Sequence, residues 1–151
     1  MVDILHKIEA KAAPQAAYAA LTTREGLAGW WTSDTRGNPG EGGVIEFYFG
    51  SGRVDMKVLE LVPGKHVLWQ VVRGPDDWMG NKITFDLAPN GDLTKILFKH
   101  QGWEQPNEFM YHCSTKWRRS CSASSRCSRP AKAPPFRTTS TFRACAIDYQ
   151  R

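Results

Sequence analysis

The segment that decides the fold is "NKITFDLAPNGDLTKILFKHQGW", residues 81–103. Apolar and polar residues alternate on both sides of a central Pro-Asn-Gly-Asp, which is a typical turn sequence. Such alternation predicts two antiparallel strands that turn one apolar face toward a core. The residues expected on that face are Ile83, Phe85, Leu87, Ile96, Phe98 and His100.

The sequence on the N-terminal side extends this hairpin into a larger sheet. Residues 52–72 repeat the pattern around Pro-Gly-Lys, and residues 44–50 and 2–10 each alternate as a single strand. Residues 36–43, "RGNPGEGG", have the composition of a loop. We therefore expect an antiparallel sheet of about six strands.

Helical patterns lie between and after these strands. Residues 14–31 hold an alanine-rich stretch and a second short turn, which predict two short helices after the first strand. Beyond Asn107, the residues Phe109, Cys113 and Trp117 recur at the spacing i, i+4, i+8 and predict a C-terminal helix with one apolar stripe. Strands and helices that are separated in this way indicate an α+β fold.

Six segments in this order carry a family resemblance: "LTTREGLAGWWT", "GGVIEFYF", "LVPGKHVLWQV", "ITFDL", "ILFKHQGW" and "FMYHCSTKW". Together they make residues 1–117 resemble the small bacterial proteins of the heat-shock protein 90 ATPase activator-like family, within the START-like, birch-pollen-allergen-like superfamily. The resemblance implies a helix-grip fold, in which a curved antiparallel sheet wraps around the C-terminal helix. It also implies a single START-like domain over residues 1–128.

The composition changes after Trp117. Residues 1–117 carry 12 Lys and Arg against 14 Asp and Glu, whereas residues 118–151 carry 8 against 1, so the net charge of +5 arises in the tail. Few aromatic residues accompany these cations, and we therefore expect no nucleic-acid partner. The prolines from Pro130 onward predict that residues 129–151 are disordered.

Members of the family continue past this point with an aliphatic helix and a turn rich in glycine and proline. One set of codons for residues 118–140 reads as such a helix and turn when a single base is restored after the codon of Trp117. We hypothesise that a single-base deletion, either a mutation or a sequencing error, replaced the native C-terminus. A natural basic extension is the alternative.

Several classes of protein are not indicated. No apolar stretch reaches the roughly 18–20 residues that span a bilayer, and the N-terminus lacks a signal pattern, so we expect a cytoplasmic protein without membrane contact. Motifs such as G-x-S-x-G and H-E-x-x-H, which would indicate catalysis, do not occur. No C-x-x-C pair indicates a zinc site, and we expect neither metal nor cofactor. The cysteines are Cys113, Cys121, Cys127 and Cys145.

A curved sheet that does not close fully on one helix leaves a concave apolar gap, which is a ligand site by default. We therefore predict that the domain binds a small apolar molecule there without changing it chemically. The residues expected to line the site are Trp30, Phe47, Phe49, Met56, Trp69, Phe85, Phe98, His100, Phe109, Cys113 and Trp117. A fully packed core is the alternative, because the same apolar residues would fill it.

Some of these positions carry more specific expectations. His100 would hold a polar atom of the ligand or act as an acid or base, and a core histidine with satisfied nitrogens is the alternative. Trp30 and Trp31 are adjacent at a helix end, so we expect only one of them to face inward. Cys113 is expected to be a small buried hydrophobe, because His112 beside it points to a different side of the helix.

The resemblance leaves two other functions open. The superfamily also contains enzymes of the polyketide cyclase or dehydratase kind, in which His100 would be the general acid or base. The name of the family implies stimulation of a heat-shock ATPase, so a chaperone is a second candidate partner. The sequence does not predict the oligomeric state.

Overall fold

The computed structural model describes residues 1–127, with side chains as far as residue 118. The tail predicted to be disordered, residues 129–151, lies outside this part, and so does most of the segment that the deletion hypothesis concerns. The elements in chain order are β1 (Val2–Ala10), α1 (Pro14–Thr22), α2 (Arg24–Trp30), β2 (Asp34–Gly37), β3 (Val44–Phe49), β4 (Gly52–Val62), β5 (His66–Arg73), η1 (Asp76–Trp78), β6 (Lys82–Asn90), β7 (Leu93–Trp103) and α3 (Glu108–Cys127).

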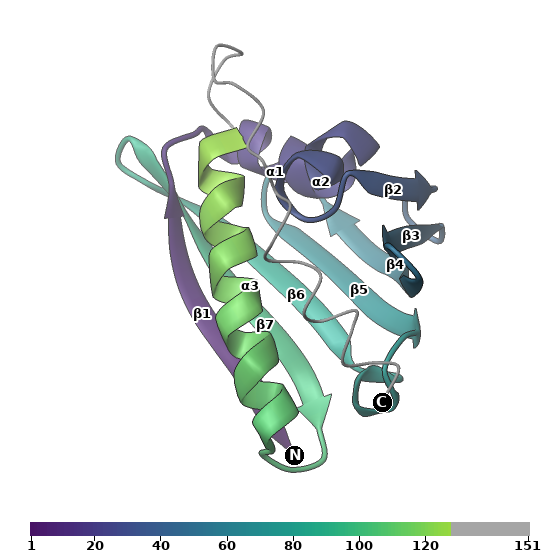
Figure 1. Cartoon of the computed structure of the whole chain (residues 1–151). Coiled ribbons are helices and arrows are strands. Elements are labelled where there is room, and N and C mark those ends of the chain that lie inside the picture. The colour runs from purple at the N-terminus through teal and green to yellow at the C-terminus, as the bar shows by residue number, and fades with distance from the viewer. Residues whose placement is uncertain (128–151) are drawn as a thin grey trace.

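The strands form one antiparallel sheet in the order β1-β7-β6-β5-β4-β3-β2. The strands from β2 to β7 follow one another as a meander, and β1 joins the sheet beside β7. In Figure 1, α3 lies along the side of the sheet formed by β1 and β7, and α1 and α2 lie toward the β2 side. The predicted α+β architecture, with a sheet against a C-terminal helix, is confirmed.

The sheet contains seven strands, one more than the expected number, and the additional strand is β2. It pairs with β3 from Asp34 opposite Tyr48 to Gly37 opposite Ile45, so the predicted loop of residues 36–43 begins as a strand. Three of its four residues are exposed. Because no face of this strand enters the core, its sequence shows no apolar alternation that would predict it.

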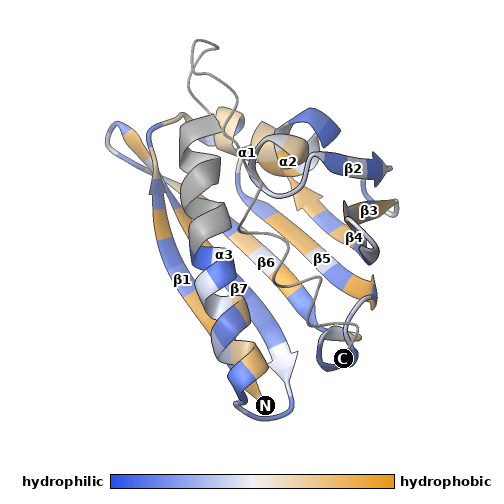
Figure 2. Ribbon diagram, viewed as in Figure 1, coloured by the Kyte–Doolittle hydropathy of each residue, from blue (hydrophilic) through white to orange (hydrophobic). Residues whose placement is uncertain are grey.

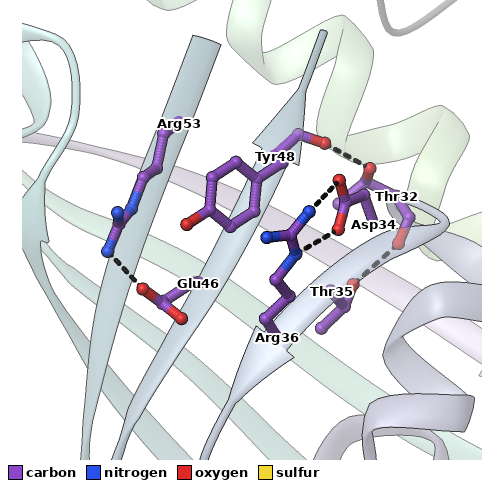
Figure 3. Close-up of polar contacts among 7 residues, drawn as sticks. All are labelled: Thr32, Asp34, Thr35, Arg36, Glu46, Tyr48 and Arg53. Carbon is purple, nitrogen blue, oxygen red and sulfur yellow. Dashed lines mark hydrogen bonds and ion pairs between the residues drawn. The ribbon is translucent and has the colours of Figure 1, made fainter. Parts of the chain in front are cut away.

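Polar contacts hold this edge of the sheet, as Figure 3 shows. Arg36 forms an ion pair with Asp34, with 2.8 Å between Nε and Oδ1, and its guanidinium lies 4.5 Å from the centre of the Tyr48 ring. Arg53 of β4 approaches the same ring at 5.1 Å and forms an ion pair with Glu46. The contacts at this edge are therefore ionic and cation–π, and the two cation–π contacts share the ring of Tyr48.

The C-terminal helix begins where the sequence predicts. The backbone N–H of Met110 donates to Oδ1 of Asn107 at 2.7 Å, which is an N-terminal cap. Met110, Cys113 and Trp117 are buried, whereas Phe109 is half-buried. The predicted apolar stripe is thus confirmed, with Phe109 at its margin.

The strands show the expected two-sided pattern. In Figure 2, hydrophobic and hydrophilic residues alternate along β5, β6 and β7. The buried members of this alternation, such as Phe98, face the helices, whereas neighbours such as Leu97 are exposed on the other side. This arrangement places one continuous core between the sheet and the helices. Within residues 1–127, no helix has the length and apolar character needed to cross a membrane.

Candidate ligand-binding site

The strand register brings the predicted site residues of the sheet together in two rows. Trp69 of β5 pairs with Ile83 of β6, which pairs with His100 of β7. In the next row, Phe85 pairs with Phe98. All five side chains are almost fully buried. Since adjacent strands lie about 4.8 Å apart, Trp69 and His100 are roughly 10 Å apart across β6.

The aromatic side chains on this face form a continuous layer. The ring centres of Trp69 and Phe85 are 5.1 Å apart, those of Phe85 and Phe98 are 5.3 Å apart, and those of Phe47 and Trp69 are 6.0 Å apart. These four residues are called the aromatic layer below. Met56 of β4, another predicted lining residue, is also fully buried on the sheet.

Two tryptophans from the helical side cover the aromatic layer. The ring of Trp117 in α3 lies 4.8 Å from that of Phe98, and the ring of Trp31 lies 4.1 Å from that of Phe47. The two tryptophan rings are themselves 4.8 Å apart. The residues predicted to line a ligand site are therefore brought together, and they contact one another directly.

The expectation that only one of Trp30 and Trp31 faces inward is wrong, because both are buried. Helix α2 ends at Trp30, and Trp31 has backbone angles φ −110° and ψ −75° that leave the regular helix. The side chains consequently do not diverge as helical neighbours would, and their rings lie nearly parallel with 6.1 Å between centres. Trp30 is fixed in place by its indole N–H, which donates to the carbonyl of Ala20 at 2.9 Å.

The remaining predicted residues lie at the margin of this cluster or on the helix. Phe49 is half-buried with its ring 5.5 Å from that of Trp31, and Phe109 is half-buried with its ring 6.0 Å from that of Trp103. Cys113 is almost fully buried on α3, so the prediction of a small buried hydrophobe is confirmed.

His100 is fully buried and lies between two polar side chains. Its Nδ1 accepts a hydrogen bond from the indole Nε1–H of Trp117 at 3.1 Å, and its Nε2 lies 3.2 Å from Nδ2 of Asn81. Burial lowers the pKa of His100 from 6.5 to about 3. The imidazole is therefore neutral at physiological pH, and the hydrogen bond from Trp117 determines which of its two nitrogens carries the proton.

An indole N–H can only donate, so Nδ1 of His100 carries no proton and the proton of the neutral ring lies on Nε2. That N–H faces the amide nitrogen of Asn81, which already donates to the carbonyl of Asp77 at 2.9 Å. Rotation of the amide would offer an oxygen to His100 but would remove the donor from Asp77. Among the described residues, the Nε2–H of His100 therefore lacks an acceptor in the first arrangement, and the carbonyl of Asp77 lacks a donor in the second.

Sequence reasoning did not identify Trp78, Trp103 or Asn81 as parts of the site. The ring of Trp78 lies 4.9 Å from that of His100, and the ring of Trp103 lies 5.0 Å from it. Trp78 belongs to the short helix η1, and Asn81 precedes β6, so neither lies in an alternating strand pattern. The only signal in the sequence was an aromatic residue inside the connection "GPDDWMG".

His6 of β1 is a further polar residue on the inner face. Its Nε2 lies 3.1 Å from both the carbonyl and the hydroxyl oxygens of Ser114, so β1 is joined to α3. Its ring stacks on that of Phe98 with 6.1 Å between centres. Burial lowers the pKa of His6, and the charge of Arg118 acts in the same direction, whereas the hydrogen bond to Ser114 raises it.

The family model of the "Activator of Hsp90 ATPase homolog 1-like protein" matches residues 11–123. A solution structure of the Aha1 dimer from Colwellia psychrerythraea is 39% identical, with a TM-score of 0.80 over 88% of this chain and 100% of that chain. No curated protein matches the sequence.

More distant structures share the fold alone. Protein MLL2253 from Mesorhizobium loti is 15% identical, with a TM-score of 0.76 over 87% of this chain and 100% of that chain. CalU16 from Micromonospora echinospora is 17% identical, with a TM-score of 0.65 over 85% of this chain and 76% of that chain.

Proposed function

Since the chain belongs to the Activator of Hsp90 ATPase homolog 1-like family, we propose that it is a ligand-binding domain that holds a small apolar molecule between the sheet and α3. Family and fold are consistent with a ligand-binding START-like domain. The observation that carries the proposal is the aromatic layer, which is covered by Trp31, directly after α2, and by Trp117 of α3.

A ligand would reach the aromatic layer by separating the two covering tryptophans, Trp31 and Trp117. Trp31 lies at the end of α2 and Trp117 lies in α3, so a small shift of one helix relative to the other would separate rings that now lie 4.8 Å apart. Such a shift requires no change in strand pairing. A planar apolar molecule would then replace the contact between the two rings, and its burial would contribute about 25 cal/mol per Å² of apolar surface.

Binding without catalysis has better support than the polyketide cyclase alternative. The pKa of His100 is lowered by burial to about 3, so its imidazole is a weak base and is not protonated near neutral pH. Its Nδ1 is already occupied by the indole of Trp117. A general acid or base is most effective with a pKa near the working pH, and His100 lies far from that condition.

Native mass spectrometry of the full chain, after incubation with an organic extract of bacterial cells, tests the proposal. We expect a stoichiometric adduct that disappears when the protein is denatured. Phe98→Leu should weaken the adduct, whereas Leu97→Ala should leave it unchanged, because these adjacent residues face opposite sides of β7. Absence of any adduct, or equal loss in both variants, would contradict the proposal.

Interaction with a chaperone is a second candidate function. It is supported by the description of the family and by 39% identity to a protein named Aha1. The test is the ATPase rate of a bacterial Hsp90 with and without the full chain. A peptide of residues 118–151 is the control, because that segment carries 8 Lys and Arg and would bind acidic surfaces non-specifically. Stimulation by the chain but not by the peptide would support this function.

A further inference from the structure

The surroundings of His100 contain more hydrogen-bond donors than acceptors. The indole Nε1–H groups of Trp78 and Trp103 are buried and have no hydrogen-bond partner among the residues that the structure describes. Both rings lie within 5.0 Å of the imidazole of His100, measured between ring centres. His100 itself is not open to a further partner, because Trp117 donates to its Nδ1 and the side-chain amide of Asn81 lies 3.2 Å from its Nε2.

Buried donors without partners are uncommon in native proteins, because each loses its bond to water and gains nothing in exchange. Two of them beside one imidazole are therefore best explained by an acceptor that the described residues do not provide. We propose that Trp78 and Trp103 form a donor pair beside His100 that binds the carbonyl oxygen of an otherwise apolar ligand. This inference rests on the proposed function and specifies the chemical class of its ligand.

The acceptor should be neutral. Among the described residues, the side chains in contact with His100 include Asn81, Trp78, Trp103 and Trp117, and none of these four carries a charge. A carboxylate placed there would lose its hydration without gaining a cation, which is costly. A carbonyl also fits better than a hydroxyl, because a hydroxyl would add one more donor to the site. Ketones, esters and amides with an apolar body are the expected class.

The test compares two probes of nearly equal shape, 2-acetylnaphthalene and 2-ethylnaphthalene, which differ in the carbonyl oxygen. Each is titrated into the ¹⁵N-labelled full chain while the indole N–H resonances are observed by NMR. We expect the ketone to bind about tenfold more tightly, as one additional buried hydrogen bond would produce. We also expect it to move the indole resonances of Trp78 or Trp103 downfield, whereas the hydrocarbon should not.

The double variant Trp78→Phe/Trp103→Phe should lose the preference for the ketone but should still bind both probes. Trp69→Phe is the matched control, because the buried indole N–H of Trp69 also has no partner among the described residues but lies two strands from His100. Trp69 belongs to the aromatic layer, so this variant should weaken both probes alike and keep the preference for the ketone. Equal affinity of the wild-type chain for the two probes would overturn this inference and leave the proposed function intact. Binding of neither probe would overturn both.

Discussion

The indole Nε1–H of Trp117 donates to Nδ1 of His100 at 3.1 Å, and this hydrogen bond joins α3 to β7 inside the core. Both residues are almost fully buried. The ring of Trp117 also contacts the rings of Trp31, Trp78 and Phe98. A single side chain therefore connects the C-terminal helix to the sheet, to α2 and to η1.

Replacement of Trp117 by Phe should destabilise the domain more than the same change at Trp103. Both substitutions remove similar volume, but only the first leaves Nδ1 of His100 without a donor. A buried acceptor without a partner costs about 1–3 kcal/mol, which is the expected difference between the two variants. Urea unfolding of both variants measures it. Equal free energies of unfolding would show that the hydrogen bond contributes nothing.

Acid should also destabilise the folded chain. Burial lowers the pKa of His100 to about 3 and also lowers that of His6, whereas in the unfolded chain both take up a proton near pH 6.5. The unfolded state therefore binds more protons below about pH 6.5, and stability falls as the pH drops toward 3. At about 1.4 kcal/mol for each pKa unit, His100 alone should account for roughly 3–5 kcal/mol of this loss.

Denaturant unfolding at a series of pH values checks this expectation. His100→Gln should flatten the decline because glutamine does not titrate. In the wild-type chain, the imidazole signals of His100 should not titrate by NMR while the fold persists above about pH 4. Titration of His100 near pH 6.5 in the folded protein would show that it is not buried as described.

The sequence was sufficient to predict the strands that bury one face. Alternation around turns predicted β4 to β7, and the spacing of Phe109, Cys113 and Trp117 predicted the apolar stripe of α3, in which Phe109 is only half-buried. The sequence did not predict β2, because the contacts of that strand are ionic and aromatic rather than apolar. An alternation pattern carries no information about such contacts.

Only the part of the candidate site that lies on alternating strand positions could be predicted from the sequence. The residues of the aromatic layer lie on alternating strand positions and could be identified. The partners of His100 could not, because Trp117 and Asn81 lie 17 and 19 residues away along the chain. The packing of α3 brings Trp117 to His100, and the pairing of β6 with β7 brings Asn81 there. Trp31 was misjudged because the chain leaves the helix at that residue.

Substitution of Tyr48 by Ala should loosen β2 selectively. The ring lies against the guanidinium groups of Arg36 and Arg53, and each exposed cation–π contact contributes about 0.5–1 kcal/mol. Hydrogen exchange of the amides of residues 34–37 should become faster, while the amides of β5 to β7 should be unaffected. Lys57→Ala, an exposed change on neighbouring β4, is the control and should leave both groups unchanged. Uniform loss of protection across the sheet would contradict a local role.

Restoration of the reading frame after Trp117 should stabilise the domain. Under the deletion hypothesis, the second half of the C-terminal helix regains three or four leucine-sized side chains, each of which contributes roughly 1.5–3 kcal/mol when buried. Thermal unfolding of the restored chain should therefore occur at a clearly higher temperature. A chain with residues 118–151 deleted is the control for simple removal of the basic segment. If the restored and the deleted chains unfold at the same temperature, the proposed helix contributes no packing.

A small apolar molecule bound between the sheet and α3 would lie close to the buried side chains of both. The most direct measurement is the set of nuclear Overhauser contacts between bound 2-acetylnaphthalene and the isotope-labelled full chain. We expect contacts to Phe98, Trp117 and Cys113, on the buried sides of β7 and α3. Contacts confined to outward-facing residues such as Leu97 and Leu5, or no contacts at all, would contradict binding at this site.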